Sequence, residues 1–445
     1  MLLADISVVV WGVCFLDNIT EVVNSGLCVG CGTCAGVCPV DALEMRVLNG
    51  LFLPVVDWDK CTLCGLCVRC CPGYAVDFEC LNHLVFGKQP EDMLTGNFLS
   101  CYVGHSNDEE IRFNSASGGV VSQLLVFALE KGLIDGVVVT RMRVDDPLVS
   151  ESFIARSKEE IVSACGSKYC PTCVNEILQQ VRREDGKFAV VGLPCQIHGV
   201  RKAEVQIEAL RDKIVLHVGL MCSHTVSYYG TLFLLSKFGI DKREVVKLDY
   251  RGRGWPGSLR VVLKDGRSFS FRFVKGWNAY WNVFSPFFFT PLRCLMCPDH
   301  FNELADVSVG DAWLPEFRDK RLGEAVVVSR TGIGESLLNQ IRDKGILSIR
   351  HVSPSRVKES QAFSLKFKKE NLSSRLSFFG IFGRKTPVFN PEPCSSGFMG
   401  FLGAFLAYFS FYVSSNTRLR SLLVYVPLPL FRLYFGLFKV LFYLT

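Results

Sequence analysis

Two copies of one cysteine motif lie near the N-terminus, and their spacing decides the fold of this region. The first copy reads Cys28-Val-Gly-Cys31-Gly-Thr-Cys34-Ala-Gly-Val-Cys38-Pro39. The second copy reads Cys61-Thr-Leu-Cys64-Gly-Leu-Cys67-Val-Arg-Cys70-Cys71-Pro72. Both follow the pattern Cys-x2-Cys-x2-Cys-x3-Cys-Pro with an offset of 33 residues, so the whole unit is repeated.

This spacing is typical of a pair of 4Fe-4S clusters. The first three thiolates of each motif wrap one face of a cubic cluster, and the fourth, which precedes proline, reaches the other cluster. Zinc, which usually takes two separated Cys-x2-Cys pairs, fits this pattern poorly. The prediction therefore has one cluster held by Cys28, Cys31, Cys34 and Cys71, and a second held by Cys61, Cys64, Cys67 and Cys38.

The composition excludes several classes of protein. Twenty of the 445 residues are cysteine, in a chain long enough to bury a large core without disulfide bonds. Hydrophobic residues make up 49% and charged residues 21%, which excludes a disordered chain, and a net charge of +6 does not call for a nucleic-acid partner. The apolar stretch 1–16 contains Asp5 and lacks a basic start, so we expect no cleaved signal. These features predict a reducing, cytoplasmic compartment.

The central region, 111–339, alternates helical and strand patterns. Apolar residues at helical spacing predict a helix over 120–131 and another over 174–181, and Ser157 and Glu160 form a capping box that opens a third. Short apolar runs predict strands at 137–139, 188–191, 213–218, 307–309 and 325–328. This alternation predicts an α/β (α+β) fold with a mixed sheet, whose strand order the sequence leaves open.

Four further cysteines stand at strand ends or in a pair. Cys195 and Cys222 each follow a predicted strand directly, and Cys294-Leu-Met-Cys297 forms a Cys-x2-Cys pair. Four thiolates suffice for a third 4Fe-4S cluster, but buried structural cysteine is an equally open interpretation, and Cys170-Pro-Thr-Cys173 is a competing pair. The remaining cysteines, Cys14, Cys70, Cys80, Cys101, Cys165 and Cys394, are expected to serve only in packing.

The chain resembles two known families. Residues 1–79 are similar to a bacterial-type two-cluster ferredoxin domain. The region of roughly 113–330 resembles the beta-subunit family of coenzyme F420 hydrogenases and dehydrogenases, and with the ferredoxin domain the resemblance covers about the first 360 residues. The blocks that carry this resemblance, in the order of the family, are Ser115-Ala-Ser117-Gly118-Gly119-Val, Gly166-Ser-Lys168-Tyr169, Gly192-Leu-Pro-Cys195-Gln196, Gly219-Leu-Met-Cys222, Cys294-Leu-Met-Cys297-Pro-Asp299 and Ala305-Asp306-Val-Ser-Val-Gly310.

The resemblance implies FAD, a 4Fe-4S cluster in the flavin domain, and hydride exchange with the deazaflavin coenzyme F420 as substrate. On the pattern of the family, the ligands of this third cluster are Cys195, Cys222, Cys294 and Cys297, and Cys170 and Cys173 are local variation. Because a deazaflavin exchanges two electrons at once and an iron–sulfur cluster exchanges one, FAD has to stand between them. No catalytic side chain is required beyond those that position the reactants.

The residues expected to contact the flavin are Ser117, Gly118, Gly119, Lys168 and Tyr169. The Ser-Gly-Gly turn precedes a helix and offers bare N–H groups to a phosphate, although a plain helix start would look the same. Lys168 is either a cation near the flavin or a solvated lysine, and Tyr169 either stacks or packs. A glycine-rich loop, Arg251-Gly-Arg-Gly-Trp-Pro-Gly257, lacks the strand–turn–helix context of a dinucleotide fingerprint, and is either a cofactor loop or a surface loop.

The C-terminal tail has a different composition. Residues 397–417 contain no charged residue, and 421–445 are apolar with a few interruptions. We expect this tail to associate with the cytoplasmic face of the membrane as a re-entrant hairpin or as interfacial helices, assisted by Lys366, Lys368, Lys369, Arg384 and Lys385. The alternative is a hairpin that packs on the protein itself or on a partner.

The predicted domains are a ferredoxin-like domain (1–85), a flavin and iron–sulfur domain (86–365), a basic linker (366–396) and the tail (397–445). The predicted function is electron transfer between F420 and one-electron carriers, through FAD and three 4Fe-4S clusters, in a larger oxidoreductase complex or with a redox partner protein. Two alternatives stay open: a ferredoxin-dependent reductase of a lipid or tetrapyrrole-type substrate, and a non-catalytic electron-transfer adaptor. His198, His217 and His224 are expected to be packed and neutral.

Overall fold

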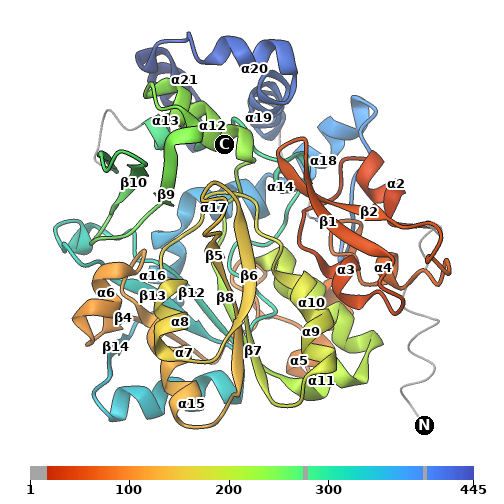
Figure 1. The fold of residues 1–445 in the computed structure, drawn as a ribbon, viewed down its shortest axis with the longest axis vertical. Helices are drawn as coiled ribbons and strands as arrows, with labels where there is room; N and C mark the ends of the chain where they lie inside the picture. Colours follow the sequence, from red (N-terminus) through yellow and green to blue (C-terminus); the bar gives the residue numbers. More distant parts are fainter. Residues whose placement is uncertain (1–17, 274–278, 394–397, 445) are drawn as a thin grey trace.

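The structure is a computed structural model that describes residues 18–273, 279–393 and 398–444. The apolar N-terminal stretch, Cys14 and Cys394 lie outside the described residues. An eight-stranded mixed sheet forms the centre of the molecule, in the order β14-β4-β13-β12-β8-β7-β5-β6 (Figure 1). Its strands are β4 Ser100–Ser106, β5 Gly136–Met142, β6 Ser150–Ala155, β7 Phe188–Gly192, β8 Ile214–Leu220, β12 Val307–Asp311, β13 Ala325–Ser329 and β14 Leu347–His351.

The four central strands, β12, β8, β7 and β5, run parallel, and antiparallel strands complete the sheet on both sides. All five strands that the sequence predicted belong to this sheet, which confirms the mixed α/β fold. The sequence patterns did not show β4, β6 and β14. The first two have polar or half-buried positions that interrupt their apolar runs, and β14 is exposed on one face.

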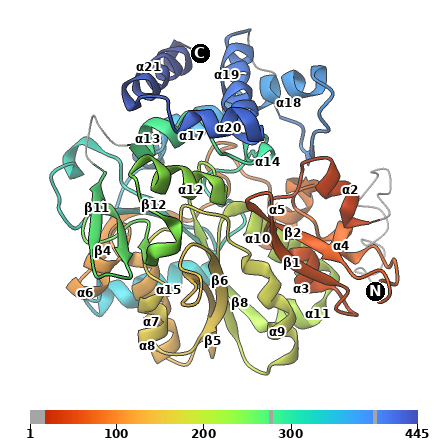
Figure 2. The same cartoon turned by 45° about the horizontal axis from the view of Figure 1, so that its top comes forward.

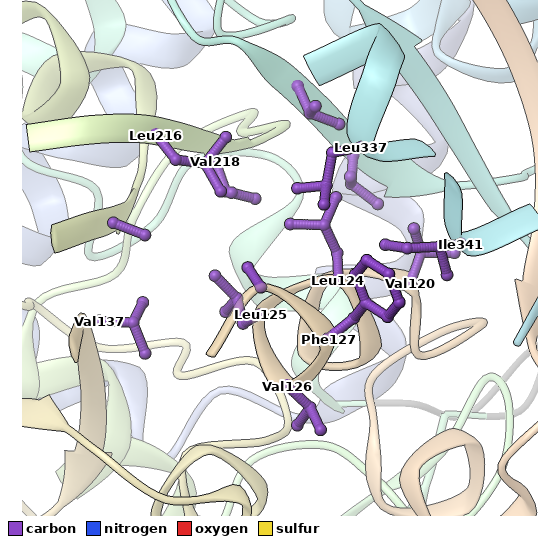
Figure 3. Packing of buried hydrophobic residues seen from close by; sticks show 14 of the residues in the cluster. Val120, Leu124, Leu125, Val126, Phe127, Val137, Leu216, Val218, Leu337 and Ile341 are labelled. Carbon is purple, nitrogen blue, oxygen red and sulfur yellow. The ribbon is translucent and has the colours of Figure 1, made fainter. Parts of the chain in front are cut away.

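Helices cover both faces of the sheet, because successive side chains of a strand point to opposite faces. Val137 of β5 packs on one face with helices α7 and α15, where Figure 3 shows Leu124 of α7 beside Leu337 of α15. Val138 points to the other face and packs with α9 and α10. The helices of these layers are α6 Glu109–Asn114, α7 Val120–Glu130, α8 Lys158–Ser163, α9 Leu178–Arg183, α10 Pro194–Gln206, α11 Glu208–Lys213 and α15 Gly332–Asp343.

The N-terminal cysteine motifs form a small unit at one side of the sheet (Figure 1). It contains α2 Ile19–Asn24, α3 Thr33–Val37, α4 Leu66–Arg69 and α5 Phe78–Phe86, the antiparallel pair β1 Leu43–Leu48 and β2 Leu51–Val56, and the short strand β3 Ala75–Asp77. Gly32 and Gly65 stand at the N-terminal ends of α3 and α4 with φ of 84° and 71°. This left-handed conformation favours glycine and lets each chain turn into its cysteine helix.

This N-terminal unit packs directly on the layer of α9 and α10. The side-chain amide of Asn175, in the 3₁₀ turn Val174–Ile177, donates to the hydroxyl of Thr33 and to the carbonyl of Gln196, both at 2.8 Å. On the other side, the buried Lys202 of α10 donates to the carbonyls of Cys71 and Ala75 at 2.7 and 2.6 Å. The two regions are therefore fastened to each other by buried polar contacts.

A second, three-stranded sheet has the order β11-β10-β9, with β9 Val245–Asp249, β10 Ser258–Leu263 and β11 Ser268–Arg272. It lies beside α12 Tyr228–Lys237, and these elements share a hydrophobic core with α13 Ala279–Phe284 and the chain that leads to α14 Leu292–Leu295. Shorter turns occur at Lys242–Glu244 and Pro315–Phe317.

The segment expected to be a basic linker is mostly structured. After α16 Pro354–Ser360 and α17 Ala362–Leu365, a π-helical turn covers Lys366–Glu370, and α18 Leu372–Ile381 follows. Strand β15 Val388–Asn390 then pairs in parallel with β3 of the N-terminal unit. Lys368 is buried and Lys369 forms an ion pair with the buried Glu303, which corrects the expectation that these two lysines face a membrane surface. The π-helical turn points them inward, which spacing alone does not reveal.

The tail forms α19 Phe398–Ser415, α20 Thr417–Leu423 and α21 Leu428–Leu444, which lie together at one end of the molecule beside α12 and α13 (Figures 1 and 2). One side of the tail is buried, including Ala404, Ala407 and Phe438. Among the described residues no single helix has the length and apolar composition to cross a membrane, and one pair, 417–423 with 428–440, meets that test together but is bent by 110°.

Candidate functional site

The first predicted cysteine set comes together around α3 and the end of α4. Burial raises the pKa of Cys34 most, and the negative charges of Cys28, Cys31 and Cys71 raise it further, so the four sulfur atoms are electrostatic neighbours. The backbone N–H of Gly30 points to the sulfur of Cys28 at 3.4 Å, as in loops whose amides face an iron–sulfur cluster. Cys71 thus lies near the cysteines of the first motif, and its role as a cluster ligand stays a prediction.

The second predicted set lines one pocket, which contains Cys38, Cys61, Cys64 and Cys67. Cys38 comes from the first motif and the other three come from the second, so the exchange of the fourth cysteine is reciprocal. Cys64 is exposed, and the adjacent Leu63 is 62% exposed. This set therefore lies at the surface, whereas most of the first set is buried.

The third predicted set assembles at the carboxyl ends of two parallel strands. Cys195 is the second residue of α10, which follows β7 closely, and Cys222 follows the neighbouring strand β8. Burial raises the pKa of Cys195, and the negative charges of Cys31, Cys294, Cys297 and Cys222 raise it further. The four predicted residues are thus neighbours, and Cys31 of the first set lies beside them.

The chemistry of these donors fits iron–sulfur clusters. All twelve cysteines are free thiols in the structure, in three sets of four. In the part of the chain that the structure describes, no three His, Cys, Asp or Glu side chains are arranged to hold a single metal ion. Raised thiol pKa values mean that the cysteines would bind a cluster with the release of protons.

Two buried cations next to the third set were missed by sequence reasoning. The Lys368 ammonium donates to the sulfur of Cys297 at 3.2 Å and to the carbonyl of Asp299 at 2.8 Å. Arg375, which is fully buried, donates to the carbonyl of Leu295 at 2.7 Å, at the end of α14 and between Cys294 and Cys297. No signal distinguished Lys368 from its neighbours in the run 366–369, because burial depends on the turn that points it inward.

The competing pair Cys170 and Cys173 is buried away from solvent. Cys173 lies against the first set: a Cβ on Gly32 would stand 2.5 Å from its sulfur, and the charges of Cys31 and Cys34 contribute to its raised pKa after burial. Cys170 belongs to the hydrophobic cluster that includes Tyr250. Cys173 thus packs against the N-terminal unit, and Cys170 packs in the hydrophobic core around Tyr250.

The Ser117-Gly118-Gly119 turn stands between the sheet and α7. The Ser117 hydroxyl donates to the carbonyl of Glu324 at 2.6 Å, and a Cβ on Gly118 would meet the carbonyl of Gly104 at 2.7 Å. Gly119 caps α7 with φ of 76°. Both glycines are buried, and among the described residues their backbone N–H groups have no hydrogen-bond partner in the chain. Two buried N–H groups at the N-terminus of an 11-residue helix suit a phosphate.

Lys168 is fixed by its own loop. Its ammonium donates to the carbonyls of Ala164, Cys165 and Gly166, and burial lowers the pKa of Lys168 to about 8. Lys168 is half-buried, and its ammonium is engaged by carbonyls of its own loop. Tyr169, by contrast, packs in a group of aromatic rings, with its ring 4.7 Å from that of Tyr280.

The glycine-rich loop that follows β9 connects these residues. The Arg251 guanidinium makes a two-pronged ion pair with Asp311, both bonds at 2.8 Å, and also donates to the Tyr169 hydroxyl at 3.0 Å. Trp255 donates to the same carboxylate at 2.9 Å. A Cβ on Gly166 would stand 2.5 Å from the Arg251 carbonyl. Since Arg251 is 4% exposed, the start of this loop is part of the interior rather than a surface loop.

One of the three histidines departs from the expectation of a neutral side chain. His217 lies between two carboxylates, with one ring nitrogen 2.6 Å from Glu204 and the other 2.9 Å from Asp306. Burial and Arg201 lower the pKa of His217, but the two carboxylates raise it more, and the net shift is upward. For His198 and His224, burial lowers the pKa, in agreement with neutral rings.

Two family models match the central region of the chain. Residues 101–179 and 185–355 match the models of the N-terminal and C-terminal parts of the coenzyme F420 hydrogenase/dehydrogenase beta subunit. Together these matches cover more than half of the chain. The chain belongs to this family. Residues 21–44 also match the 4Fe-4S binding domain, so this F420 hydrogenase/dehydrogenase beta-subunit relative carries iron–sulfur clusters. It is an electron-transfer protein of an oxidoreductase family.

Two curated relatives illustrate the range of the family. The chain is 28% identical to the coenzyme F420 hydrogenase subunit beta of Methanothermobacter thermautotrophicus, over 58% of this chain and 87% of that protein. It is also 28% identical to the coenzyme F420-dependent sulfite reductase of Methanocaldococcus jannaschii, over 79% of this chain but only 51% of that protein. The longer match to the reductase covers more of this chain.

A solved structure shares the fold. It belongs to the F420-reducing [NiFe] hydrogenase complex from Methanosarcina barkeri, with a TM-score of 0.52 and 24% identity. The match covers 68% of this chain and 99% of the solved chain. The family matches end at residue 355, so Lys368, Arg375 and the tail lie beyond them.

Proposed function

We propose that this protein transfers electrons between coenzyme F420 and one-electron carriers, with FAD and three 4Fe-4S clusters as its cofactors. The observation that carries the proposal is the serial arrangement of the three cysteine sets. Cys195 of the third set lies near Cys31 of the first set. The first and second sets each combine cysteines from both N-terminal motifs, and the second set lies at the surface. This arrangement supports a path from the interior of the flavin domain to the outside.

The flavin would bind near the Ser117-Gly118-Gly119 turn. The two free glycine N–H groups at the start of α7 suit its pyrophosphate, and Tyr169 and Arg251 border the same region through Gly166 and the glycine-rich loop. When bound, FAD supplies the conversion between hydride transfer and one-electron transfer. The residues of the chain position it and exclude water, and Lys168 acts by holding its own loop in place.

The cysteines are assigned as predicted: Cys28, Cys31, Cys34 and Cys71 for the first cluster, Cys38, Cys61, Cys64 and Cys67 for the second, and Cys195, Cys222, Cys294 and Cys297 for the third. The domain division follows: a ferredoxin-like domain at 1–85, a flavin domain at 86–365, the connecting segment 366–396 and the tail 397–445. Because the solved relative comes from a hydrogenase complex, we propose that this chain works in a larger oxidoreductase complex. Its many free cysteines favour a reducing compartment, the cytoplasm.

An anaerobic titration with reduced F420 tests the proposal. The full-length protein, purified with its flavin, should lose flavin absorbance as reduced F420 is added, and oxidised F420 should appear. A flavin that does not bleach would contradict the F420 reaction. If ferredoxin then reduced the same flavin, the alternative ferredoxin-dependent reductase would be favoured, and protein that releases no flavin on denaturation would be the adaptor.

The third cluster has a separate test. Three clusters of four irons predict ~12 iron atoms per chain. Cys195→Ala should lower this number to ~8, whereas the matched variant Cys101→Ala, at a buried cysteine outside the three sets, should leave it unchanged. A wild-type value of ~8 would remove the third cluster.

We also propose that the tail contacts the cytoplasmic face of a membrane. Its exposed apolar side chains are Phe405, Phe409, Tyr412, Leu422, Tyr425, Leu430, Leu433, Leu437 and Val440. After Glu392 the sequence has four basic residues and no acidic residue, which suits an anionic lipid surface. The protein should float with vesicles that contain anionic lipid, and Leu433→Glu should release it. A wild-type protein that does not bind such vesicles, and that carbonate extracts completely from native membranes, would contradict this assignment.

A further inference from the structure

Lys368 occupies an unusual position for a lysine. Its side chain is 2% exposed, and its ammonium reaches the sulfur of Cys297 at 3.2 Å and the carbonyl of Asp299 at 2.8 Å. Among the described residues, it forms no ion pair with a carboxylate. Asp299 directs its own carboxylate to His198, 2.8 Å away.

A buried ammonium needs compensating negative charge, because removal from water strongly disfavours an unpaired ion. The Lys368 ammonium donates to the sulfur of Cys297, a member of the third set, and this sulfur would supply the compensating charge as a cluster-bound thiolate. With a cluster bound, the thiolates of the third set would act as the counter-ion of this lysine. An ordinary salt bridge plays no part here.

The local structure holds Lys368 in this position. The π-helical turn Lys366–Glu370 places two consecutive side chains inward, and Phe367 stacks on Phe287 with ring centroids 4.2 Å apart. Arg375 lies over the ring of Phe367 at 3.7 Å and donates to the carbonyl of Leu295. Turns of this type occur frequently at functional sites. This segment therefore packs against the third cysteine set, although it lies beyond the residues that match the family.

We infer that Lys368 raises the reduction potential of the cluster held by Cys195, Cys222, Cys294 and Cys297. This inference rests on the third cluster of the proposed function. Net charge and hydrogen bonds to the sulfurs are the main levers that a protein has on such a potential. A cluster gains one negative charge when it accepts an electron, and a fixed ammonium at hydrogen-bond distance from a ligand sulfur stabilises this more negative state. The C-terminal segment thereby tunes how readily the third cluster accepts electrons.

The test is a redox titration of the full-length protein, followed by electron paramagnetic resonance. The signal of the third cluster is the one that Cys195→Ala removes. Lys368→Gln should lower the equilibrium constant for reduction of this cluster at least tenfold, which corresponds to 59 mV for one electron. Lys368→Arg, which keeps the charge, should keep the potential of this cluster close to the wild-type value. The control Lys366→Gln removes the same charge two residues away, at a side chain for which the structure describes no contact with the four cysteines.

A second readout leaves Lys368 in place, in case Lys368→Gln fails to retain the cluster. In protein labelled with ¹⁵N-lysine, the reduced third cluster should show a hyperfine coupling to a lysine nitrogen. Lys368→Arg should abolish this coupling, because its arginine carries no label. Absence of the coupling in the wild-type protein, or an unchanged potential in Lys368→Gln, would overturn the inference while an iron content of ~12 left the third cluster intact. A wild-type content of ~8 would instead refute the third cluster itself.

Discussion

The junction between the N-terminal unit and the layer of α9 and α10 can be tested at Gly36. This glycine lies in α3, where a Cβ would overlap the carbonyl oxygen of Asn175 and stand 2.9 Å from the Cβ of Leu178. Because the nearest obstacle is backbone, Gly36→Ala should push α3 away from the 3₁₀ turn Val174–Ile177. The same movement would strain the hydrogen bond from the Asn175 amide to Thr33.

Overpacking in a well-packed interior costs about 1–3 kcal/mol. The entropy gained when glycine becomes alanine in a helix offsets roughly 0.5–1 kcal/mol of this. With backbone on the far side of the contact, we place the net loss in the unfolding free energy of Gly36→Ala at about 1–2 kcal/mol. With a urea dependence of about 3 kcal/mol per molar, the midpoint should fall by roughly 0.3–0.7 M.

The matched control is Gly380→Ala in α18, where an added Cβ meets no atom within 4 Å. This variant should keep or slightly raise the midpoint of anaerobic urea unfolding, followed by tryptophan fluorescence. Gly36→Ala should also slow the passage of electrons from the reduced flavin to the first cluster, measured by stopped-flow absorbance, since the spacing between the first and third cysteine sets would increase. Equal midpoints for the two variants would refute the packing described at this junction.

Three other outcomes follow from buried groups. Asp311→Asn would leave the Arg251 guanidinium buried without its counter-ion. The unfolding free energy should therefore fall by about 3–5 kcal/mol, and the flavin content should fall with it. An unchanged midpoint of urea unfolding would contradict this. Cys71→Ala should lower the iron content by ~4 atoms, whereas Cys70→Ala should retain all iron, and the opposite result would reverse the assignment of these adjacent cysteines. His217 has a raised pKa, so its stabilising contribution is present below pH ~6.5 and is lost as the pH rises through the folded-state pKa. The stability difference between wild type and His217→Gln should shrink over that range, and a difference that grows with pH would show that this histidine is neutral.

The cysteine sets show which groupings the spacing of residues in the sequence can predict. The exchange of Cys38 and Cys71 between the two motifs could be predicted, because three closely spaced thiolates leave the fourth cysteine directed to the other set. The neighbourhood of Cys195 and Cys222 depends on β7 and β8 being adjacent and parallel. Strand order is a long-range property, so spacing alone left the third set open, and only the resemblance to a family suggested it.

The direction in which side chains point was a second feature that the sequence could not predict. The run of basic residues around Lys368 suggested a surface that faces lipid, but the π-helical turn directs Lys368 and Lys369 inward. The tail has the composition expected of a membrane segment, and its helices bury one side against α12, α13 and α18 and leave another side exposed. Sequence composition measures how apolar a segment is, and only packing decides which neighbour covers it.

The sequence by itself determined the local features of this protein: two reciprocal cysteine motifs, the alternation of helix and strand, and the glycine turn before α7. Each of these depends on residues close together in the chain, whose conformational preferences act at short range. The tertiary structure alone decided which distant groups meet: Cys31 beside Cys195, Arg251 against Asp311, and Lys368 on Cys297. Such contacts depend on sheet order and on the burial of charge, which no local pattern encodes, because their energies arise only when the segments pack together and exclude water.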